Sequence, residues 1–97
     1  MLFHVHMATH VPDTMDAETL AALQAKERAH GAPLQESGVW RHLWRVAGKY
    51  ENISIFDVSG PDELHDILSG LPLHPYMNVS VTALSHHPGS IKHDDES

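Results

Sequence analysis

The N-terminal segment alternates between apolar and polar positions. Over residues 2–8, the apolar side chains fall at Phe3, Val5 and Met7, with histidines between them. This period of two is typical of a strand with one buried face. Three further segments have the composition of strands: residues 39–47, 50–58 and 76–84. Gly48-Lys49 separates the first two of these and predicts a tight turn, so the pair is expected to form an antiparallel hairpin.

A long segment instead carries its apolar residues at helical spacing. In residues 16–37, Leu20, Leu23 and Glu27 lie three and four positions apart and therefore share one helix face. Short polar residues before this segment are candidate N-terminal caps: Asp13, Thr14 and Asp16. The segment is predicted to be an amphipathic helix that ends at Gly38.

Gly31 and Pro33 interrupt the second half of this helix. Proline removes one helical hydrogen bond and clashes with the carbonyl four residues before it. We therefore expect a kink or break near residues 29–33. A second, shorter helix is predicted over residues 61–69, where apolar residues again recur at three and four and Gly70 stops the pattern.

The predicted order is strand, helix, strand, strand, helix, strand. With short connections and right-handed crossovers, this order gives an α+β, ferredoxin-like fold: a four-stranded antiparallel sheet with both helices on one face. The sequence predicts one domain over residues 1–85 and a polar C-terminal tail over residues 86–97 that could cover a neighbouring subunit's pocket. The uncovered face of the sheet carries aromatic positions and is expected to pack on another subunit.

Composition narrows the possible partners. The chain has 97 residues and a formal net charge of −7, which disfavours nucleic acid as a partner. It has no cysteine, which excludes disulfides and thiolate chemistry. The N-terminus lacks the pattern of a signal peptide, and no apolar run is long enough to span a bilayer, so no membrane partner and a cytoplasmic location are expected.

Ten histidines raise the possibility of a metal site. His4 and His6 are two residues apart on one strand face, and His42 or His10 could supply a third ligand. No spacing typical of metal ligands recurs, however. The sequence therefore predicts no metal, with a metal-binding barrel kept as an alternative.

The central hairpin resembles a known family. The run from Trp40 to Tyr50, WRHLWRVAGKY, with Asn52, Ser54 and the Phe56-Asp57-Val58 triplet after it, resembles the signature of muconolactone delta-isomerases. Further matching segments are Leu64-His65-Asp66, Leu71-Pro72-Leu73, Pro75-Tyr76-Met77, His87-Pro88 and Ser90-Ile91. The resemblance covers essentially the whole chain and also extends to dehalogenases of 5-chloromuconolactone.

The resemblance implies a cofactor-free enzyme that converts muconolactone to the 3-oxoadipate enol-lactone in catechol degradation. It implies a ferredoxin-like fold and a homodecamer built from dimers. The family's catalytic glutamate follows a lysine in the long helix, and Glu27 after Lys26 matches it. His74 stands where the family usually has an aromatic residue, so it is expected to contact the substrate and to alter the pocket's shape.

The chemistry of this reaction suggests roles for other residues. An allylic isomerisation needs a base that also returns the proton, and a buried carboxylate such as Glu27 can do both. Developing enolate charge needs a hydrogen-bond donor, for which Tyr50, Asn52 or Ser54, on one face of their strand, are candidates. Arg41 and Arg45, four apart and so expected to point the same way, are candidates for binding the substrate carboxylate, with Lys26 a weaker one.

Each assignment has a structural alternative. Glu27 could be a solvated residue paired with Lys26, Arg28 or Lys49, and the polar strand face or the arginines could serve subunit contacts instead. At the level of function, the alternatives are 5-chloromuconolactone dehalogenation on the same fold, a non-catalytic or metal-binding dimeric barrel, and a cofactor-free monooxygenase. The family resemblance favours the isomerase.

Overall fold

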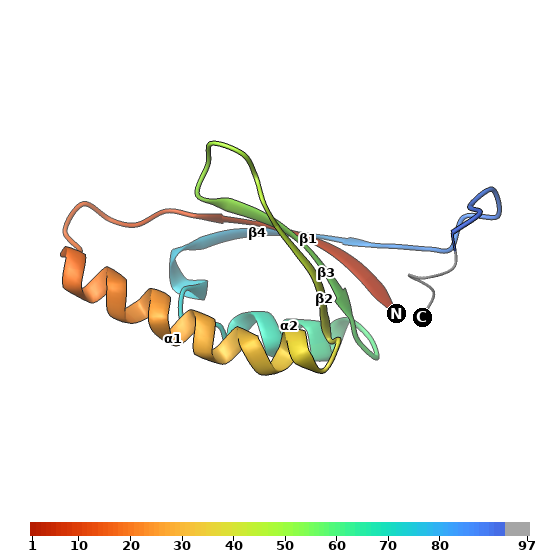
Figure 1. Ribbon diagram of the computed structural model, residues 1–97, viewed down its shortest axis with the longest axis horizontal. Coiled ribbons are helices and arrows are strands. Elements are labelled where there is room, and N and C mark those ends of the chain that lie inside the picture. Colours follow the sequence, from red (N-terminus) through yellow and green to blue (C-terminus); the bar gives the residue numbers. More distant parts are fainter. Residues whose placement is uncertain (93–97) are drawn as a thin grey trace.

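A computed structural model describes residues 1–92 and contains the predicted elements in the predicted order (Figure 1). They are β1 (Leu2–Thr9), α1 (Ala17–Glu36), β2 (Trp40–Arg45), β3 (Glu51–Asp57), α2 (Pro61–Ser69), the short 3₁₀ helix η1 (His74–Tyr76) and β4 (Met77–Ala83). The strands form one antiparallel sheet in the order β2-β3-β1-β4. Both helices lie on one face of it, which confirms the ferredoxin-like prediction.

The core lies between the sheet and the helices. The inward-facing residues of β1 are those that alternated in the sequence, and Val5 and Met7 have no solvent exposure. They pack with apolar residues from β2, β3, α2 and the segment after it: Trp40, Phe56, Val58, Leu64, Leu68 and Leu71. The rings of Trp40 and Phe56 stack with their centroids 5.0 Å apart. This cluster packs α2 tightly against the sheet.

Helix α1 begins at a capped end and continues without a break. The Asp16 side chain accepts a hydrogen bond from the Thr19 N–H at 2.7 Å, which satisfies one of the free donors of the first turn. Of the kink or break expected near residues 29–33, the break is absent, because one helix continues through Pro33 to Glu36, and that part of the prediction was wrong. Ala29 and Pro33 both lie on the exposed side of α1, so water can satisfy the carbonyl that Pro33 leaves without its helical donor.

Gly31 has a packing role rather than a breaking one. It is the buried residue of α1, and a Cβ at this position would lie 3.0 Å from Cζ3 of Trp40. Because that ring is backed by Phe56, it has little freedom to move aside. The absence of a side chain at residue 31 therefore allows the helix to approach β2.

We expect Gly31→Ala to destabilise the protein by about 1 kcal/mol. The gain in helix propensity, about 1 kcal/mol, is smaller than the typical cost of overpacking a core, about 1–3 kcal/mol. Denaturant unfolding measures the difference. Ala32→Gly, at an exposed position of the same helix, is the control for propensity alone. A stabilised Gly31→Ala variant would contradict this account of the packing.

The β2–β3 hairpin has a longer connection than the predicted two residues. The strands end at Arg45 and begin again at Glu51, and the Lys49 N–H donates to the Val46 carbonyl at 3.1 Å. Gly48, the third residue of this turn, has φ +80°, a conformation that glycine adopts without steric cost. The hairpin itself is confirmed, but its strands are joined by the five residues 46–50, within which Val46 to Lys49 form the turn.

A β-bulge at the start of β2 changes which side chains share a face. Trp40 pairs with Phe56 and His42 with Ile55, which leaves Arg41 as an extra residue. Beyond the bulge, Arg45 pairs with Asn52 and lines the helix-side cavity, whereas Nη1 of Arg41 forms an ion pair with Asp57 at 3.1 Å. The expectation that Arg41 and Arg45 point the same way was therefore wrong.

The opposite face of the sheet is uncovered by helices (Figure 1). It carries Trp44, which is 55% exposed and stacks on His42 with ring centroids 4.8 Å apart. His6 Nε2 lies 2.7 Å from a Glu51 carboxylate oxygen on the neighbouring strand. Within residues 1–92, no group of three or more histidine or acidic side chains is arranged to hold a metal ion.

The chain after β4 extends away from the body of the molecule (Figure 1). All of residues 84–92 are exposed, and Ile91 is 86% exposed. The remainder of the predicted tail, residues 93–97, lies outside the described residues. In the part of the chain that the structure describes, neither helix combines the length and apolar character needed to cross a membrane.

Candidate active site

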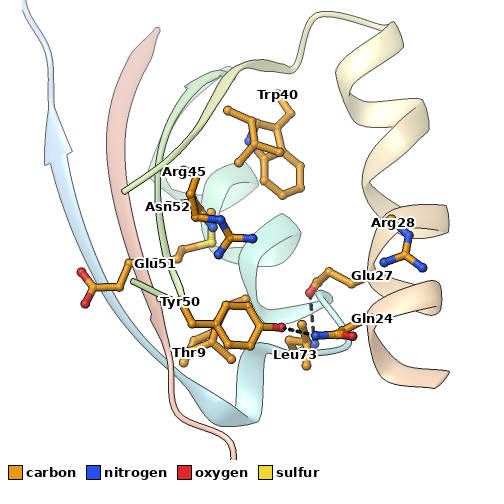
Figure 2. A pocket seen from close by; sticks show the side chains of 13 residues that line it. Thr9, Gln24, Glu27, Arg28, Trp40, Arg45, Tyr50, Glu51, Asn52 and Leu73 are labelled. Atoms are coloured by element: carbon orange, nitrogen blue, oxygen red, sulfur yellow. Dashed lines mark hydrogen bonds between the residues drawn. The ribbon is translucent and has the colours of Figure 1, made fainter. Parts of the chain in front are cut away.

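A cavity of about 480 Å³ lies between α1, the β2–β3 hairpin and the segment around Leu73. Its volume is in the range typical of small-molecule sites. Part of its wall is apolar: Met7, Trp40, Leu43, Leu73 and Met77. The polar part comes mainly from α1 and the hairpin: Thr9, Gln24, Glu27, Arg28, Arg45, Tyr50, Glu51 and Asn52. Figure 2 shows Glu27 and Gln24 of α1 facing Tyr50 and Arg45 of the hairpin across this space, whereas the Glu51 side chain points away from it.

Glu27 is the acidic side chain on the helix wall of the cavity. Its Oε2 accepts a hydrogen bond from the Leu73 backbone N–H at 3.3 Å (Figure 2). Its Oε1 is buried and has no hydrogen-bond partner. Burial raises the pKa of Glu27 above its ordinary value, against the Leu73 hydrogen bond and the nearby His30 and His74, which lower it. A partly buried carboxylate with a raised pKa, on the wall of a cavity, is typical of residues that exchange protons in active sites.

A second buried polar atom on the cavity wall is also unpartnered. Trp40 is 6% exposed, and its Nε1 donor has no acceptor within residues 1–92. Among the described residues, the buried side-chain atoms without a partner are this N–H and Oε1 of Glu27, and both belong to residues that line the cavity. Buried polar groups are usually satisfied, so their coincidence here is typical of a site that receives a polar ligand.

Tyr50 forms the side of the cavity opposite Gln24. Its backbone carbonyl accepts a hydrogen bond from the Thr9 N–H at 3.0 Å, which ties the start of the side chain to the end of β1. Its hydroxyl accepts a hydrogen bond from Nε2 of Gln24, also at 3.0 Å (Figure 2). The main chain of Tyr50 is therefore fixed to the sheet, and its hydroxyl is fixed to α1.

Asn52 and Ser54 share the inward face of β3, as predicted. Ser54 has no solvent exposure and does not line the cavity; its hydroxyl donates to Oδ1 of Asn52 at 2.7 Å. This bond uses one of the two acceptor positions of the amide oxygen and fixes the orientation of the amide, and both N–H donors of Asn52 are left for a ligand. Ser54 therefore holds the Asn52 side chain, and Asn52 is the one of the two that lines the cavity.

The predicted cations separate into two groups. Arg45 lines the cavity, and its guanidinium lies over the Tyr50 ring, 5.4 Å from the centroid. Arg41 is engaged with Asp57, and Lys26 is exposed on α1; neither lines the cavity. His74 is not a lining residue either, although it is close enough for its charge to act on Glu27.

Three contributors to the site were missed by the sequence analysis. Gln24 and Arg28 are one turn before and one residue after Glu27, so the helical spacing of residues around the base could have indicated Gln24. Leu73 contributes its backbone N–H, which no side-chain pattern reveals. Of the residues singled out in the sequence, Glu27, Arg45, Tyr50 and Asn52 line the cavity, whereas the groups that hold them were not predicted.

Comparison with known proteins identifies the family. The family model described as muconolactone delta-isomerase matches residues 1–90. Muconolactone Delta-isomerase 2 of Acinetobacter lwoffii is 58% identical to this chain over 99% of both chains. The muconolactone Delta-isomerases of Acinetobacter baylyi and Pseudomonas aeruginosa are 50% and 47% identical to it, respectively. Both of these matches cover 98% of this chain and 99% of the relative. A crystal structure of muconolactone isomerase superposes with a TM-score of 0.91 at 49% identity, covering 99% of this chain and all of that one. The chain belongs to the muconolactone delta-isomerase family.

Proposed function

We propose that this protein is an isomerase that converts muconolactone to the 3-oxoadipate enol-lactone. The reaction removes a proton from the ring carbon beside the ring oxygen and leaves a dienolate. The same proton, or one exchanged from water, is then added to the carbon next to the lactone carbonyl. The carbon–carbon double bond moves by one position, and atoms and charge are unchanged overall.

The observation that carries this proposal is the environment of Glu27. A single carboxylate must first accept a proton from carbon and then return it, which requires a pKa brought towards working pH. Burial beside Trp40 and Leu73 supplies that shift, and Oε1 has no other partner. We assign Glu27 as the base in the first step and the acid in the second.

The hairpin side of the cavity supplies the complementary groups. The dienolate carries negative charge on the former carbonyl oxygen, and preplaced donors stabilise such charge most effectively. The Tyr50 hydroxyl and the Asn52 NH₂ group face the cavity from this side and are assigned to that role, with Ser54 positioning Asn52. Arg45 is assigned to the substrate's free carboxylate, which a guanidinium can bind through two parallel hydrogen bonds.

Turnover of muconolactone in heavy water tests this function. The expected result is a change in lactone absorbance together with deuterium incorporation at the carbon beside the carbonyl, unaffected by a metal chelator. Chloride release from 5-chloromuconolactone, with no turnover of muconolactone, would instead establish the dehalogenase alternative. Absence of both reactions, or complete loss of turnover on chelation, would contradict the proposal.

We also propose that the protein works as a homo-oligomer, a decamer built from dimers. The uncovered sheet face supports this, because Trp44 together with Ile53 and Ile55 forms an apolar surface next to the His6–Glu51 pair. Residues 84–92 extend away from their own domain, which suits a segment that covers a neighbouring subunit's pocket. Sedimentation measures the assembly, and a monomer at all concentrations would rule it out.

A cytoplasmic location fits such an enzyme of aromatic catabolism, and fractionation of cells tests it.

A further inference from the structure

The hydroxyl group of Tyr50 has a defined hydrogen-bond direction. A phenol has one proton to donate and lone pairs that accept. The amide nitrogen of Gln24 can only donate, so in the 3.0 Å bond between them the Tyr50 oxygen is the acceptor. The phenolic proton takes no part in that bond. It remains available for an acceptor inside the cavity that both residues line.

We propose that Gln24 is a positioning residue that turns Tyr50 into a donor toward the substrate's enolate oxygen. This inference rests on the proposed function, because it specifies how one of its assigned donors is set. Gln24 makes the phenol a better donor in two ways. It holds the tip of a side chain that starts in the hairpin loop, and the hydrogen bond that it donates polarises the phenol, which strengthens the O–H as a donor.

The position of Gln24 on α1 gives this arrangement a second consequence. Gln24 and Glu27 are three residues apart, so they lie on the same helix face one above the other. One rigid helix therefore sets both the base and, through Gln24, the donor on the opposite wall (Figure 2). The Thr9–Tyr50 backbone bond fixes the main chain from which this side chain starts, and the Arg45 guanidinium lies over its ring.

A double-mutant cycle tests the coupling between the two residues. Gln24→Leu, which keeps the approximate size and removes the donor, is expected to lower kcat by about three- to tenfold, the size typical of one hydrogen bond, with KM nearly unchanged. In the Tyr50→Phe background, the same substitution should have no further effect on kcat. Additive losses would overturn the proposal, because Gln24 would then act independently of the hydroxyl.

Gln24→Glu separates positioning from packing. Its shape matches glutamine, but a carboxylate accepts the phenolic proton and so directs it away from the substrate. We expect a lower kcat than in Gln24→Leu, and that additional loss should disappear in the Tyr50→Phe background. A merely structural role predicts the opposite order, with the isosteric glutamate variant the more active. Gln35→Leu, at an exposed position of α1, is the matched control and should behave as wild type.

One measurement needs no turnover. Labelling tyrosine at the hydroxyl-bearing ring carbon gives two carbon-13 signals, since the chain has two tyrosines, and Tyr50→Phe assigns them. Gln24→Leu is expected to shift the Tyr50 signal in the free protein and leave that of Tyr76 in place. An unmoved Tyr50 signal overturns the proposed hydrogen bond even if the enzyme is active. A moved signal in a protein that does not isomerise the lactone would count against the proposed function alone.

Discussion

Replacing Glu27 by glutamine is expected to lower kcat by at least about 10²- to 10⁴-fold, the usual contribution of positioned proton transfer. Glutamine keeps the size of the side chain and an acceptor for the Leu73 N–H, but it cannot take a proton from carbon. Deuterium uptake from heavy water should fall in parallel with turnover. Glu36→Gln, at the exposed end of the same helix, is the matched control and should keep full activity. If Glu27→Gln retained more than about a tenth of the wild-type rate, another group would have to be the base.

The same substitution has an expected effect on stability, of known sign. Burial raises the pKa of Glu27 in the folded protein above its value in the unfolded chain. The folded state therefore binds this proton more tightly, so the corresponding stability is present at low pH and is lost as the pH rises through the unfolded and then the folded pKa. Glu27→Gln, which has no charge to bury, should be at least as stable as wild type at neutral pH in denaturant unfolding.

The pH dependence of kcat/KM follows from the same raised pKa. The free enzyme needs the ionised carboxylate, so activity should fall in acid with an inflection above that of an ordinary glutamate, about 4.3. An inflection at or below that value would indicate that the carboxylate is hydrated in the working enzyme.

Arg45→Met is expected to raise KM by about ten- to a hundredfold with a smaller change in kcat. The substitution keeps the aliphatic part of the side chain and removes the charge-assisted hydrogen bonds to the substrate carboxylate, typically worth about 1.5–3 kcal/mol. Steady-state kinetics measure both constants. The wild-type KM should also rise with ionic strength, and this dependence should weaken in the variant.

Arg41→Met is the matched control, because the two arginines belong to the same strand and only Arg45 lines the cavity. Its KM should stay near the wild-type value, although loss of the bond to Asp57 can lower stability. If Arg41→Met raised KM and Arg45→Met did not, the assignment would be reversed. If neither did, Arg28 would be the remaining arginine among the lining residues.

Local pattern was sufficient to predict most of the fold. The alternation of Phe3, Val5 and Met7 marks a strand with one buried face, and that face is the one in the core. The position of Glu27 on the cavity wall was accessible from sequence for a related reason, since Leu20, Leu23 and Glu27 share the helix face that turns toward the sheet. Periodicity reports which residues point inward, and the cavity is formed by inward-pointing residues.

The failures arose where long-range packing overrides local preference. Pro33 indicated a broken helix, but the freed carbonyl of Ala29 is on the solvent side, and Leu34 and Gly31 hold the helix on the core from either side of the proline. The partners of the site side chains were equally hidden. The Leu73 amide reaches Glu27 across 46 positions of sequence, and no pattern within one element encodes such a contact.

The extra residue at Arg41 decides what the rest of its strand can do. Without it, strict alternation from Trp40 would place the Trp44 indole in the cavity and the Arg45 guanidinium on the uncovered face of the sheet. One inserted residue lets this six-residue strand place Trp40 in the protein interior, Trp44 on the uncovered face and Arg45 at the cavity. Under the role proposed for Arg45, a relative that lacked this insertion would have to bind the substrate carboxylate from another element, even with an otherwise identical set of residues.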